Sequence, residues 1–221
     1  MNGRMKGDVV LIEEHHKKAA TAIVSEILEK IKSKAERYTI TVAGESGSGK
    51  SETGKAIADE LEKFGIKSVL LGQDDYFKLP PKSNDAKRRK DPEWLGPHVE
   101  VKLDLMEQHL KDAIHGKDEL VKPLIDYNQN SIEEETVSLK GIRVIIAEGT
   151  YTSLLKSVDT RIFIARNRLD TLEHRKQRNR GNEINDPFIE QVLSTEHKII
   201  AGHKRLADFI ITKDYDVLTV E

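Results

Sequence analysis

A glycine-rich stretch, "GESGSGKS", is the part of the sequence best suited to holding phosphate. Gly44, four residues, Gly49, Lys50 and Ser51 complete the P-loop pattern between a predicted strand and a predicted helix. The glycines let backbone N–H groups turn toward an anion, and the amino end of the helix adds partial positive charge. Lys50 can bridge the outer phosphates of a nucleoside triphosphate, and the Ser51 hydroxyl can coordinate Mg²⁺. The expected nucleotide-binding residues are Gly44, Glu45, Ser46, Gly47, Ser48, Gly49, Lys50, Ser51 and Glu52.

Carboxylates follow two other predicted strands. Asp74 and Asp75 occur in "LLGQDDYF", at a strand's carboxyl end, where open α/β sheets bind ligands. Adjacent side chains point to different sides, so one of the two can face the phosphate site as a base or a Mg²⁺ ligand; the alternative is an ordinary turn or N-cap. Glu148 ends "VIIAEG" as the acidic residue of a Walker B element does. We expect Ser51, Asp74 and Glu148 to form the metal site.

The segment "ARNRLDTLEHRKQRNRG" is dense in arginine. On a helix, Arg168, Arg175 and Arg178 share one face, because they are seven and then three residues apart. Two interpretations are open: a solvated basic face, or a mobile lid whose arginines neutralise transition-state charge and exclude water. The preceding P-loop and carboxylates favour the lid.

The composition excludes several classes of protein. The 221 residues carry a net charge of −2, which gives no overall attraction to nucleic acid or membrane. Cysteine is absent, which removes disulfides and thiolate chemistry. No apolar run approaches the roughly 18 residues of a membrane span, and the D-x-x-G and N-K-x-D patterns of GTPases are missing. We expect a cytoplasmic protein with a small-molecule partner and neither a nucleic-acid nor a membrane partner.

The elements that position these residues follow from apolar spacing. A helix is predicted over 10–34, then a strand at "YTITVAG", a helix over 50–64 with Ile57, Leu61 and Phe64 inward, and a strand at "KSVLLG". Strand, glycine loop, helix and strand make a βαβ unit, which implies a parallel sheet with a right-handed crossover.

The rest of the chain extends this pattern. The polar, aperiodic segment 76–100 is predicted to be a long functional loop. Helices are expected over 101–115, 169–180 and 187–201, a strand pair in "ELVKPLIDYNQNSIEEETVSLK", and buried strands at "GIRVIIAEG", "TRIFIA" and "ADFIIT". The expected fold is three-layer α/β/α with a mainly parallel sheet, a small β-hairpin insertion and an Arg-rich helical lid.

The amino-terminal helix leaves two interpretations open. It covers a hydrophobic edge of its own domain, which we favour, or it docks a partner or a second copy, so a homo-oligomer stays open. His15 and His16 could suggest a metal site, but neighbouring helical positions diverge, so surface histidines are expected.

Together, GESGSGKS, QDDYF, PLIDYN, VIIAEG and the Arg-rich helix resemble the uridine kinase and phosphoribulokinase family, from residue 38 to about 217. The resemblance implies a P-loop kinase domain over 38–221, preceded by the amphipathic helix at 1–37. It also implies an ATP- and Mg²⁺-dependent kinase that phosphorylates an alcohol of a small metabolite, most closely a uridine kinase.

The family's base is an aspartate in a D-S-F-Y-like motif; Asp74 matches it, with Asp75 in the serine place. Further matches are Lys50 and Ser51 for the P-loop, Glu148 and Gly149 for the strand-ending E-G, and Arg175, Arg178 and Arg180 for the lid. The implied catalytic residues are Asp74, Lys50, Arg175 and Arg178.

The departures from this family lie where the substrate is chosen. Uridine kinases carry a P-x-Y-D-F-x-x-H-S-R-like segment whose Tyr and His hold the uracil. Here "PLIDYNQNSI" puts Ile125, Asn130 and Ile132 in the Tyr, His and Arg places, while Asp126 and Tyr127 keep the acidic-aromatic pair. In "GPHVEVKLD", His98, Glu100 and Asp104 are candidates for the ribose side. The expected substrate-binding residues are Asp75, Tyr76, His98, Asp126, Tyr127 and Asn130.

The acceptor is therefore left open. A sugar-phosphate or vitamin (pantothenate-like) kinase is the first alternative, with "AKRRK" at 86–90 either holding a substrate phosphate or forming a solvated loop. A non-catalytic ATP-sensing regulator is the second.

Overall fold

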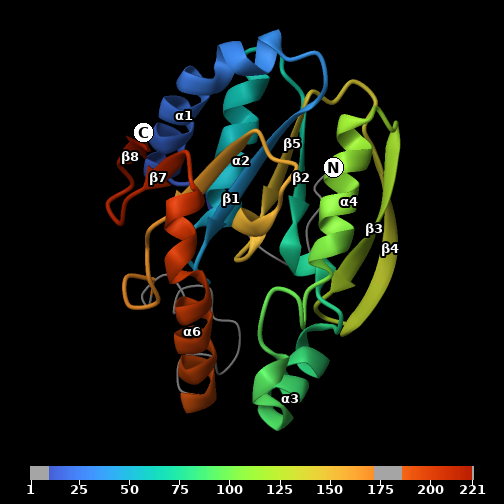
Figure 1. The fold of residues 1–221 in the computed structure, drawn as a ribbon, viewed down its shortest axis with the longest axis vertical. Coiled ribbons are helices and arrows are strands. Elements are labelled where there is room, and N and C mark those ends of the chain that lie inside the picture. The colour runs from blue at the N-terminus through green and yellow to red at the C-terminus, as the bar shows by residue number, and fades with distance from the viewer. Residues whose placement is uncertain (1–9, 172–185, 221) are drawn as a thin grey trace.

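A six-stranded sheet forms the middle layer of the protein (Figure 1). The computed structural model describes residues 10–171 and 186–220. The strand order is β2-β5-β1-β6-β7-β8, and each neighbouring pair is parallel except β7 with β8. The strands are β1 (Tyr38–Gly44), β2 (Ser68–Gly72), β5 (Val144–Glu148), β6 (Thr160–Ile164), β7 (Phe209–Ile211) and β8 (Val217–Thr219). The predicted mainly parallel sheet is confirmed, and β8 adds a strand that the sequence pattern did not indicate.

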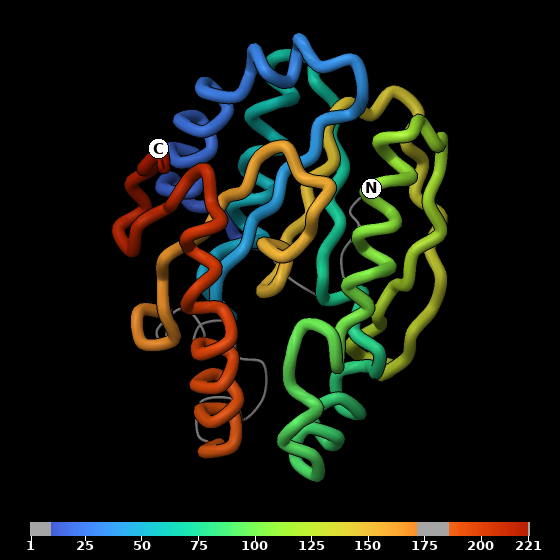
Figure 2. The backbone as a smooth tube through the Cα atoms, in the orientation of Figure 1, coloured from blue at the N-terminus to red at the C-terminus, as the bar shows by residue number. Residues whose placement is uncertain are grey.

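Helices cover both faces of the sheet, which gives the three predicted layers (Figures 1 and 2). One face carries α1 and α2; the other carries α4 and an antiparallel hairpin that forms its own two-stranded sheet. The helices are α1 (Glu14–Ser33), α2 (Lys50–Glu62), α3 (Pro81–Lys90), α4 (Leu103–Ile114) and α6 (Pro187–Ile200). The hairpin strands are β3 (Glu119–Asp126) and β4 (Ser131–Ser138). Short 3₁₀ turns are η1 (Gln73–Tyr76), η2 (Pro92–Trp94), η3 (Thr152–Leu154) and η4 (Ala201–Leu206).

The register of the sheet brings the candidate chemistry to one edge. Glu148 is level with Val42 of β1 and with Gly72 of β2. The P-loop, which follows β1, and the aspartates, which follow β2, therefore lie on either side of the end of β5. Carboxyl ends of parallel strands are the ligand-binding edge of such sheets.

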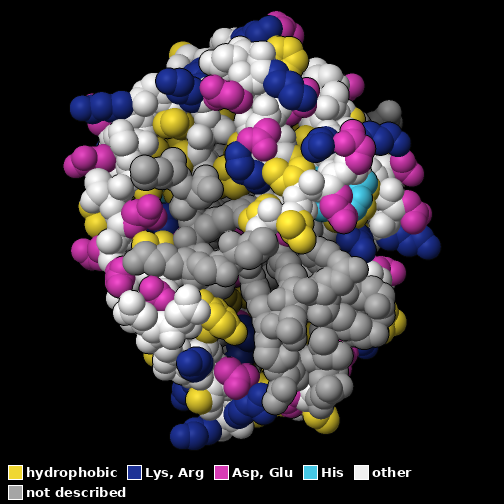
Figure 3. Space-filling view, turned by 180° about the vertical axis from the view of Figure 1, so that it is seen from behind, with side chains coloured by type: hydrophobic (Ala, Val, Ile, Leu, Met, Phe, Trp, Pro, Cys, Tyr) yellow, Lys and Arg dark blue, Asp and Glu magenta, His cyan; other side chains and the backbone are white. Residues whose placement is uncertain are grey.

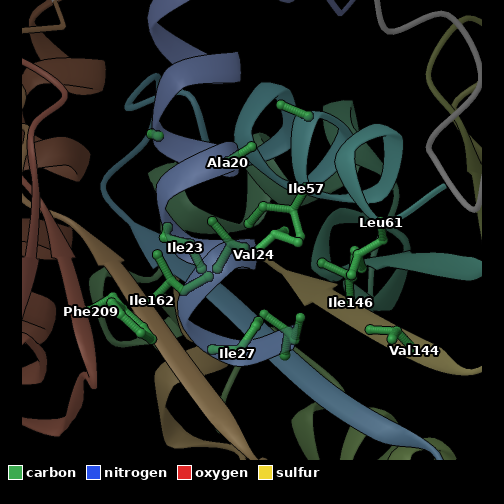
Figure 4. Close-up of a cluster of buried hydrophobic side chains, with 14 of the residues drawn as sticks. Ala20, Ile23, Val24, Ile27, Ile57, Leu61, Val144, Ile146, Ile162 and Phe209 are labelled. Atoms are coloured by element: carbon green, nitrogen blue, oxygen red, sulfur yellow. The ribbon is translucent and has the colours of Figure 1, made fainter. Parts of the chain in front are cut away.

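The amino-terminal helix α1 packs into the core of its own chain. Ala20, Ile23 and Ile27 are fully buried and lie against α2 and the sheet, in the cluster drawn in Figure 4. Because the apolar face of α1 is buried by this internal packing, the helix covers an edge of its own domain, which is the interpretation favoured above. The boundary between residues 1–37 and 38–221 stays a prediction.

Two details near α1 and α2 correct the sequence expectations. His16, expected at the surface, is 1% exposed, because its ring packs beside Tyr215 near the start of α1. Phe64, expected inside, is 50% exposed, because α2 ends at Glu62 and the chain turns at Gly65.

The predicted long loop over 76–100 is also corrected, since it contains α3. This helix has no apolar stripe; it begins with Pro81 at its first position and buries Asn84 through polar contacts. The pattern of apolar spacing misses such a helix because it packs through hydrogen bonds and charge pairs. The predicted Arg-rich helix over 169–180 lies almost entirely outside the described residues.

The surface agrees with the balanced charge of the sequence. Figure 3 shows acidic and basic side chains interspersed over the coloured part of the rear face. Within residues 10–171 and 186–220, no helix has both the length and the apolar character needed to cross a bilayer.

Candidate active site

The phosphate loop joins β1 to α2 through glycines in the left-handed region. Gly47 has φ +76° and Gly49 has φ +94°, and α2 begins directly afterwards at Lys50. A Cβ on Gly49 would overlap the Tyr215 hydroxyl, so the close approach of these two groups also requires glycine there. The Lys50 ammonium donates to the Glu45 carbonyl at 2.9 Å, within the loop. The predicted phosphate cradle therefore has the geometry that its sequence indicates.

The metal-binding pair predicted from two separate motifs is brought together. The Ser51 hydroxyl donates to Glu148 Oε1 at 3.1 Å, although the residues are 97 positions apart. Glu148 is 7% exposed at the end of β5. A hydroxyl and a carboxylate below a phosphate loop are oxygen ligands that suit Mg²⁺. Asp74, the third predicted ligand, is exposed on η1 and lines a neighbouring cavity.

Helix α6 covers the loop with Glu196, an acidic residue that the sequence analysis did not single out. The Ser46 N–H donates to Glu196 Oε1 at 3.1 Å. Burial raises the pKa of Glu196, and the Lys50 charge opposes that rise. Glu45, predicted to contact nucleotide, instead directs its carboxylate to the Arg168 N–H at 2.7 Å and to His197 Nδ1 at 2.5 Å.

The loop is also held from its other side, by residues near both ends of the chain. The Tyr215 hydroxyl donates to the Ser48 carbonyl at 3.1 Å and accepts from Arg166 Nη1 at 3.1 Å. His16 Nε2 lies 3.1 Å from the same hydroxyl, while His16 Nδ1 accepts from the Glu13 N–H at 3.0 Å. Nε2 therefore carries the proton and donates to Tyr215. Both nitrogens of His16 are engaged in this arrangement, which argues against using them for a metal ion. No sequence pattern predicted the contact between His16 and Tyr215.

A cavity of about 390 Å³ opens beside Asp74, between α3 and the start of α6. Its apolar walls include Phe77, Ile125 and Tyr127, and Asp74 lies among its polar groups. The remaining charged lining residues are Lys82, Asp85, Arg88 and Arg89 of α3, with Asp186 at the N-cap of α6. This volume lies within the roughly 300–1,000 Å³ of small-molecule sites.

The structure separates the two adjacent aspartates and corrects two expected substrate contacts. Asp75 is fully buried; its carboxylate accepts from Lys122 Nζ at 2.6 Å and from the Ile125 N–H at 3.0 Å. Tyr76 is also fully buried, with its hydroxyl 2.8 Å from His109 Nδ1. Both side chains anchor η1 to the protein interior, and we no longer propose substrate contact for them. Asp74 is the aspartate that faces the cavity.

The hairpin residues predicted to bind substrate have different positions. Tyr127 lines the cavity. Asp126 instead caps its own turn by accepting from the N–H groups of Asn128 and Gln129. Asn130 joins the hairpin to α3, since it accepts from the Lys82 N–H at 2.8 Å and donates to Ser83 Oγ at 3.1 Å.

Three further candidates, His98, Glu100 and Asp104, do not line the cavity. His98 is exposed, and its carbonyl accepts from Lys78 Nζ. Glu100 is a buried partner of Arg88, described below, and Asp104 lies in the first turn of α4. Arg175, Arg178 and Arg180 lie outside the described residues, so their roles stay predictions.

Comparison with known protein families gives the lineage of this site. The model of the phosphoribulokinase/uridine kinase family matches residues 39–213. The chain belongs to this family. The match leaves out His16 and Tyr215, so the contact between them lies at the margins of the family's domain.

Two relatives of this family member are named for different activities. The bifunctional alpha-galactosidase/sucrose kinase of Mediterraneibacter gnavus is 29% identical over 192 residues, which is 82% of this chain and 20% of that protein. The uridine kinase of Bacillus thuringiensis is 29% identical over 186 residues, which is 78% of this chain and 84% of that protein. The chain therefore spans only a fifth of the first relative and most of the second.

A solved structure shares the fold. A possible uridine kinase from Bacillus stearothermophilus superimposes with a TM-score of 0.64 at 18% identity, covering 88% of this chain and 97% of the other. The three-layer P-loop kinase fold expected from the sequence is thus confirmed. The chain is an ATP-dependent kinase acting on an alcohol group, as its family membership shows.

Proposed function

We propose that the enzyme transfers the γ-phosphoryl group of ATP, with Mg²⁺, to a hydroxyl of a small metabolite bound beside Asp74. The observation that carries this proposal is the pairing of Ser51 with Glu148 at 3.1 Å below the phosphate loop, next to a cavity lined by Asp74. A donor site and an acceptor site then meet at one edge of the sheet.

The residues of the candidate site have distinct parts in the proposed reaction. The N–H groups of 44–49 hold the phosphates, and Lys50 moves from the Glu45 carbonyl to the outer phosphate oxygens. Ser51 and Glu148 would hold Mg²⁺, which supplies charge neutralisation on the phosphates when bound. Asp74 orients the acceptor hydroxyl and takes its proton. Arg175 and Arg178 are predicted to close over the site as a lid.

The acceptor has two candidate classes. Similarity to uridine kinases supports a nucleoside, which would become a nucleoside 5′-monophosphate. Similarity to a sucrose kinase supports a sugar.

The decisive experiment compares Asp74→Asn with Asp118→Asn, a matched change at an exposed aspartate outside the cavity. ADP release would be measured with Mg²⁺ and ATP over a panel of nucleosides, sugars, sugar phosphates and vitamins. We expect Asp74→Asn to lower transfer about 10²–10⁴-fold, while binding of a nonhydrolysable ATP analogue stays within twofold of the native protein. Full turnover by Asp74→Asn would reject Asp74 as the base.

A further inference from the structure

The guanidinium groups in the cavity beside Asp74 already have carboxylate partners. Arg88 donates from Nε at 2.7 Å and from Nη2 at 2.6 Å to Oε2 of Glu100, whose side chain is 0% exposed. Arg89 donates from Nε to Asp85 at 2.8 Å and from Nη2 to Asp186. Both guanidinium groups are therefore already paired with carboxylates of this chain. This pairing argues against the interpretation in which "AKRRK" binds a phosphate group of the substrate.

The cavity has no surplus positive charge among its described lining residues. Three carboxylates, Asp74, Asp85 and Asp186, face three cations, Lys82, Arg88 and Arg89. The Arg89 hydrogen bond holds the pKa of Asp186 below its ordinary value, so that pair stays ionised at neutral pH. A phosphate or carboxylate on the acceptor would meet these carboxylates and would have to compete for an arginine already bound. The cavity disfavours an anionic acceptor.

Among the described lining residues, the side-chain amide that could read both a donor and an acceptor on a nucleobase is already engaged. The one side-chain amide among the described lining residues belongs to Asn84. Its Nδ2 donates to Glu100 at 3.0 Å and its Oδ1 accepts from Trp94 Nε1 at 2.7 Å. Ile125 adds only apolar surface. A site selective for a base needs polar groups placed to match it, and an unmatched partner costs much of that selectivity.

Paired charges next to apolar walls instead suit adjacent hydroxyl groups. A hydroxyl both donates and accepts, so neighbouring hydroxyls can bond the free lone pairs of Asp85 or Asp186 and the remaining N–H groups of Arg89. Phe77 and Tyr127 offer flat surface for the C–H face of a sugar ring. We infer that the acceptor is an uncharged, unphosphorylated sugar or related polyol. This inference rests on the proposed function and names its substrate class.

The reaction on such an acceptor balances without a further reagent. One sugar hydroxyl oxygen forms a bond to the γ-phosphorus of ATP, and the bond from that phosphorus to the β–γ bridging oxygen breaks. The electron pair of the broken bond leaves on ADP. The hydroxyl proton goes to Asp74 and then to solvent, and the products are the sugar phosphate and ADP.

The first test measures ADP release with neutral mono- and disaccharides, with sugar phosphates, and with uridine and cytidine, at equal concentrations with Mg²⁺ and ATP. We expect kcat/KM for at least one neutral sugar to exceed that for every nucleoside and sugar phosphate by about 100-fold or more. Preference for a nucleoside or a sugar phosphate would overturn the inference and leave the kinase function standing. Turnover of nothing would count against the proposed function itself.

A binding measurement further distinguishes failure of the inferred substrate class from failure of the proposed kinase function. Calorimetry of Asp74→Asn with the same neutral sugars and a nonhydrolysable ATP analogue reads acceptor binding without transfer. Sugar binding by this variant supports the inference even where transfer is absent. If uridine or a sugar phosphate binds and no neutral sugar does, the inference is wrong.

A charge-release variant tests the physical reason. Asp85→Asn combined with Asp186→Asn removes both partners of Arg89 and leaves its guanidinium unpaired. We expect KM for the neutral sugar to rise about tenfold and binding of the corresponding sugar phosphate to become measurable. Lys87→Gln is the control, because Lys87 lies on the same helix, pairs with Asp91 and does not line the cavity. If the double variant discriminates between sugar and sugar phosphate as the native protein does, charge pairing is not what selects the acceptor.

Discussion

His16 and Tyr215 are 199 residues apart in the sequence, yet their side chains share a hydrogen bond of 3.1 Å against the phosphate loop. The Tyr215 hydroxyl in turn donates a hydrogen bond to the Ser48 carbonyl of that loop. An amino-terminal helix and a carboxyl-terminal turn, both outside the residues of the family match, therefore fix the backbone that is proposed to hold the donor phosphates.

Tyr215→Phe should weaken ATP binding while keeping the ring in place. The change removes the donor to Ser48 and leaves the N–H groups of His16 and Arg166 without their acceptor. Loss of hydrogen bonds of this kind predicts a Kd for a nonhydrolysable ATP analogue about five- to tenfold higher, measured by calorimetry. Tyr38→Phe is the control, because it loses a buried hydrogen bond to Thr160 at the opposite end of β1. Equal losses in both variants would mean that the Tyr215 effect is general destabilisation.

Glu148→Gln should weaken the metal site selectively. Glutamine keeps an acceptor for Ser51 but removes the negative charge from the proposed Mg²⁺ site. We expect the Mg²⁺ concentration that half-saturates ATP-analogue binding to rise about 10–100-fold. Glu62→Gln, at an exposed end of α2, should leave it unchanged. An unaltered Mg²⁺ requirement in Glu148→Gln would remove Glu148 from the metal site.

Glu196→Gln should stabilise the protein at high pH. Because burial raises the folded-state pKa above its ordinary value of 4.5, the folded protein holds this proton more tightly than the unfolded chain. Stability from Glu196 is thus present below pH 4.5 and is lost as pH rises through the raised folded-state pKa. Glutamine still accepts from Ser46 but does not ionise, so we expect Tm at pH 8 to rise by about 2–4 °C, or ~1 kcal/mol, and the gain to vanish near pH 4.5. A gain that is the same at both pH values would contradict this account; Glu190→Gln, exposed on the same helix, is the control.

Ile27→Ala should show that α1 belongs to the folding core. Ile27 is fully buried between α2 and the sheet (Figure 4). We expect a loss of about 2–5 kcal/mol in the free energy of unfolding, measured by urea denaturation, whereas Leu11→Ala, at 66% exposure, should change it by less than about 0.5 kcal/mol. Light scattering before and after the change should give the same mass. Dissociation of an oligomer by Ile27→Ala would instead make α1 an interface.

The parts of the fold that depend on local pattern could be predicted from the sequence. The glycine spacing around Lys50 and the apolar strands ending at Gly44 and Glu148 predicted the P-loop and the sheet, because each signal lies within a short window. The hairpin followed from two alternating runs around a turn. The meeting of Ser51 with Glu148 then followed from parallel strand order.

Features that depend on contacts between distant segments could not be predicted in this way. His16 looked like a surface residue because its partner is near the other end of the chain. Asp74 and Asp75 are indistinguishable in sequence; burial of one against Lys122 decides which faces the cavity. Glu196 and α3 were missed because polar contacts, rather than apolar spacing, place them.

The β3–β4 hairpin has its own two-stranded sheet and is fastened to α3 by Asn130, apart from the six strands that carry the phosphate loop. Most residues that line the cavity lie between β2 and β5, from Asp74 to Tyr127, whereas the phosphate loop joins β1 to α2. Because Asp74 is the proposed base, we expect substitutions at the other lining residues of this segment to change the choice of acceptor while ATP binding is kept.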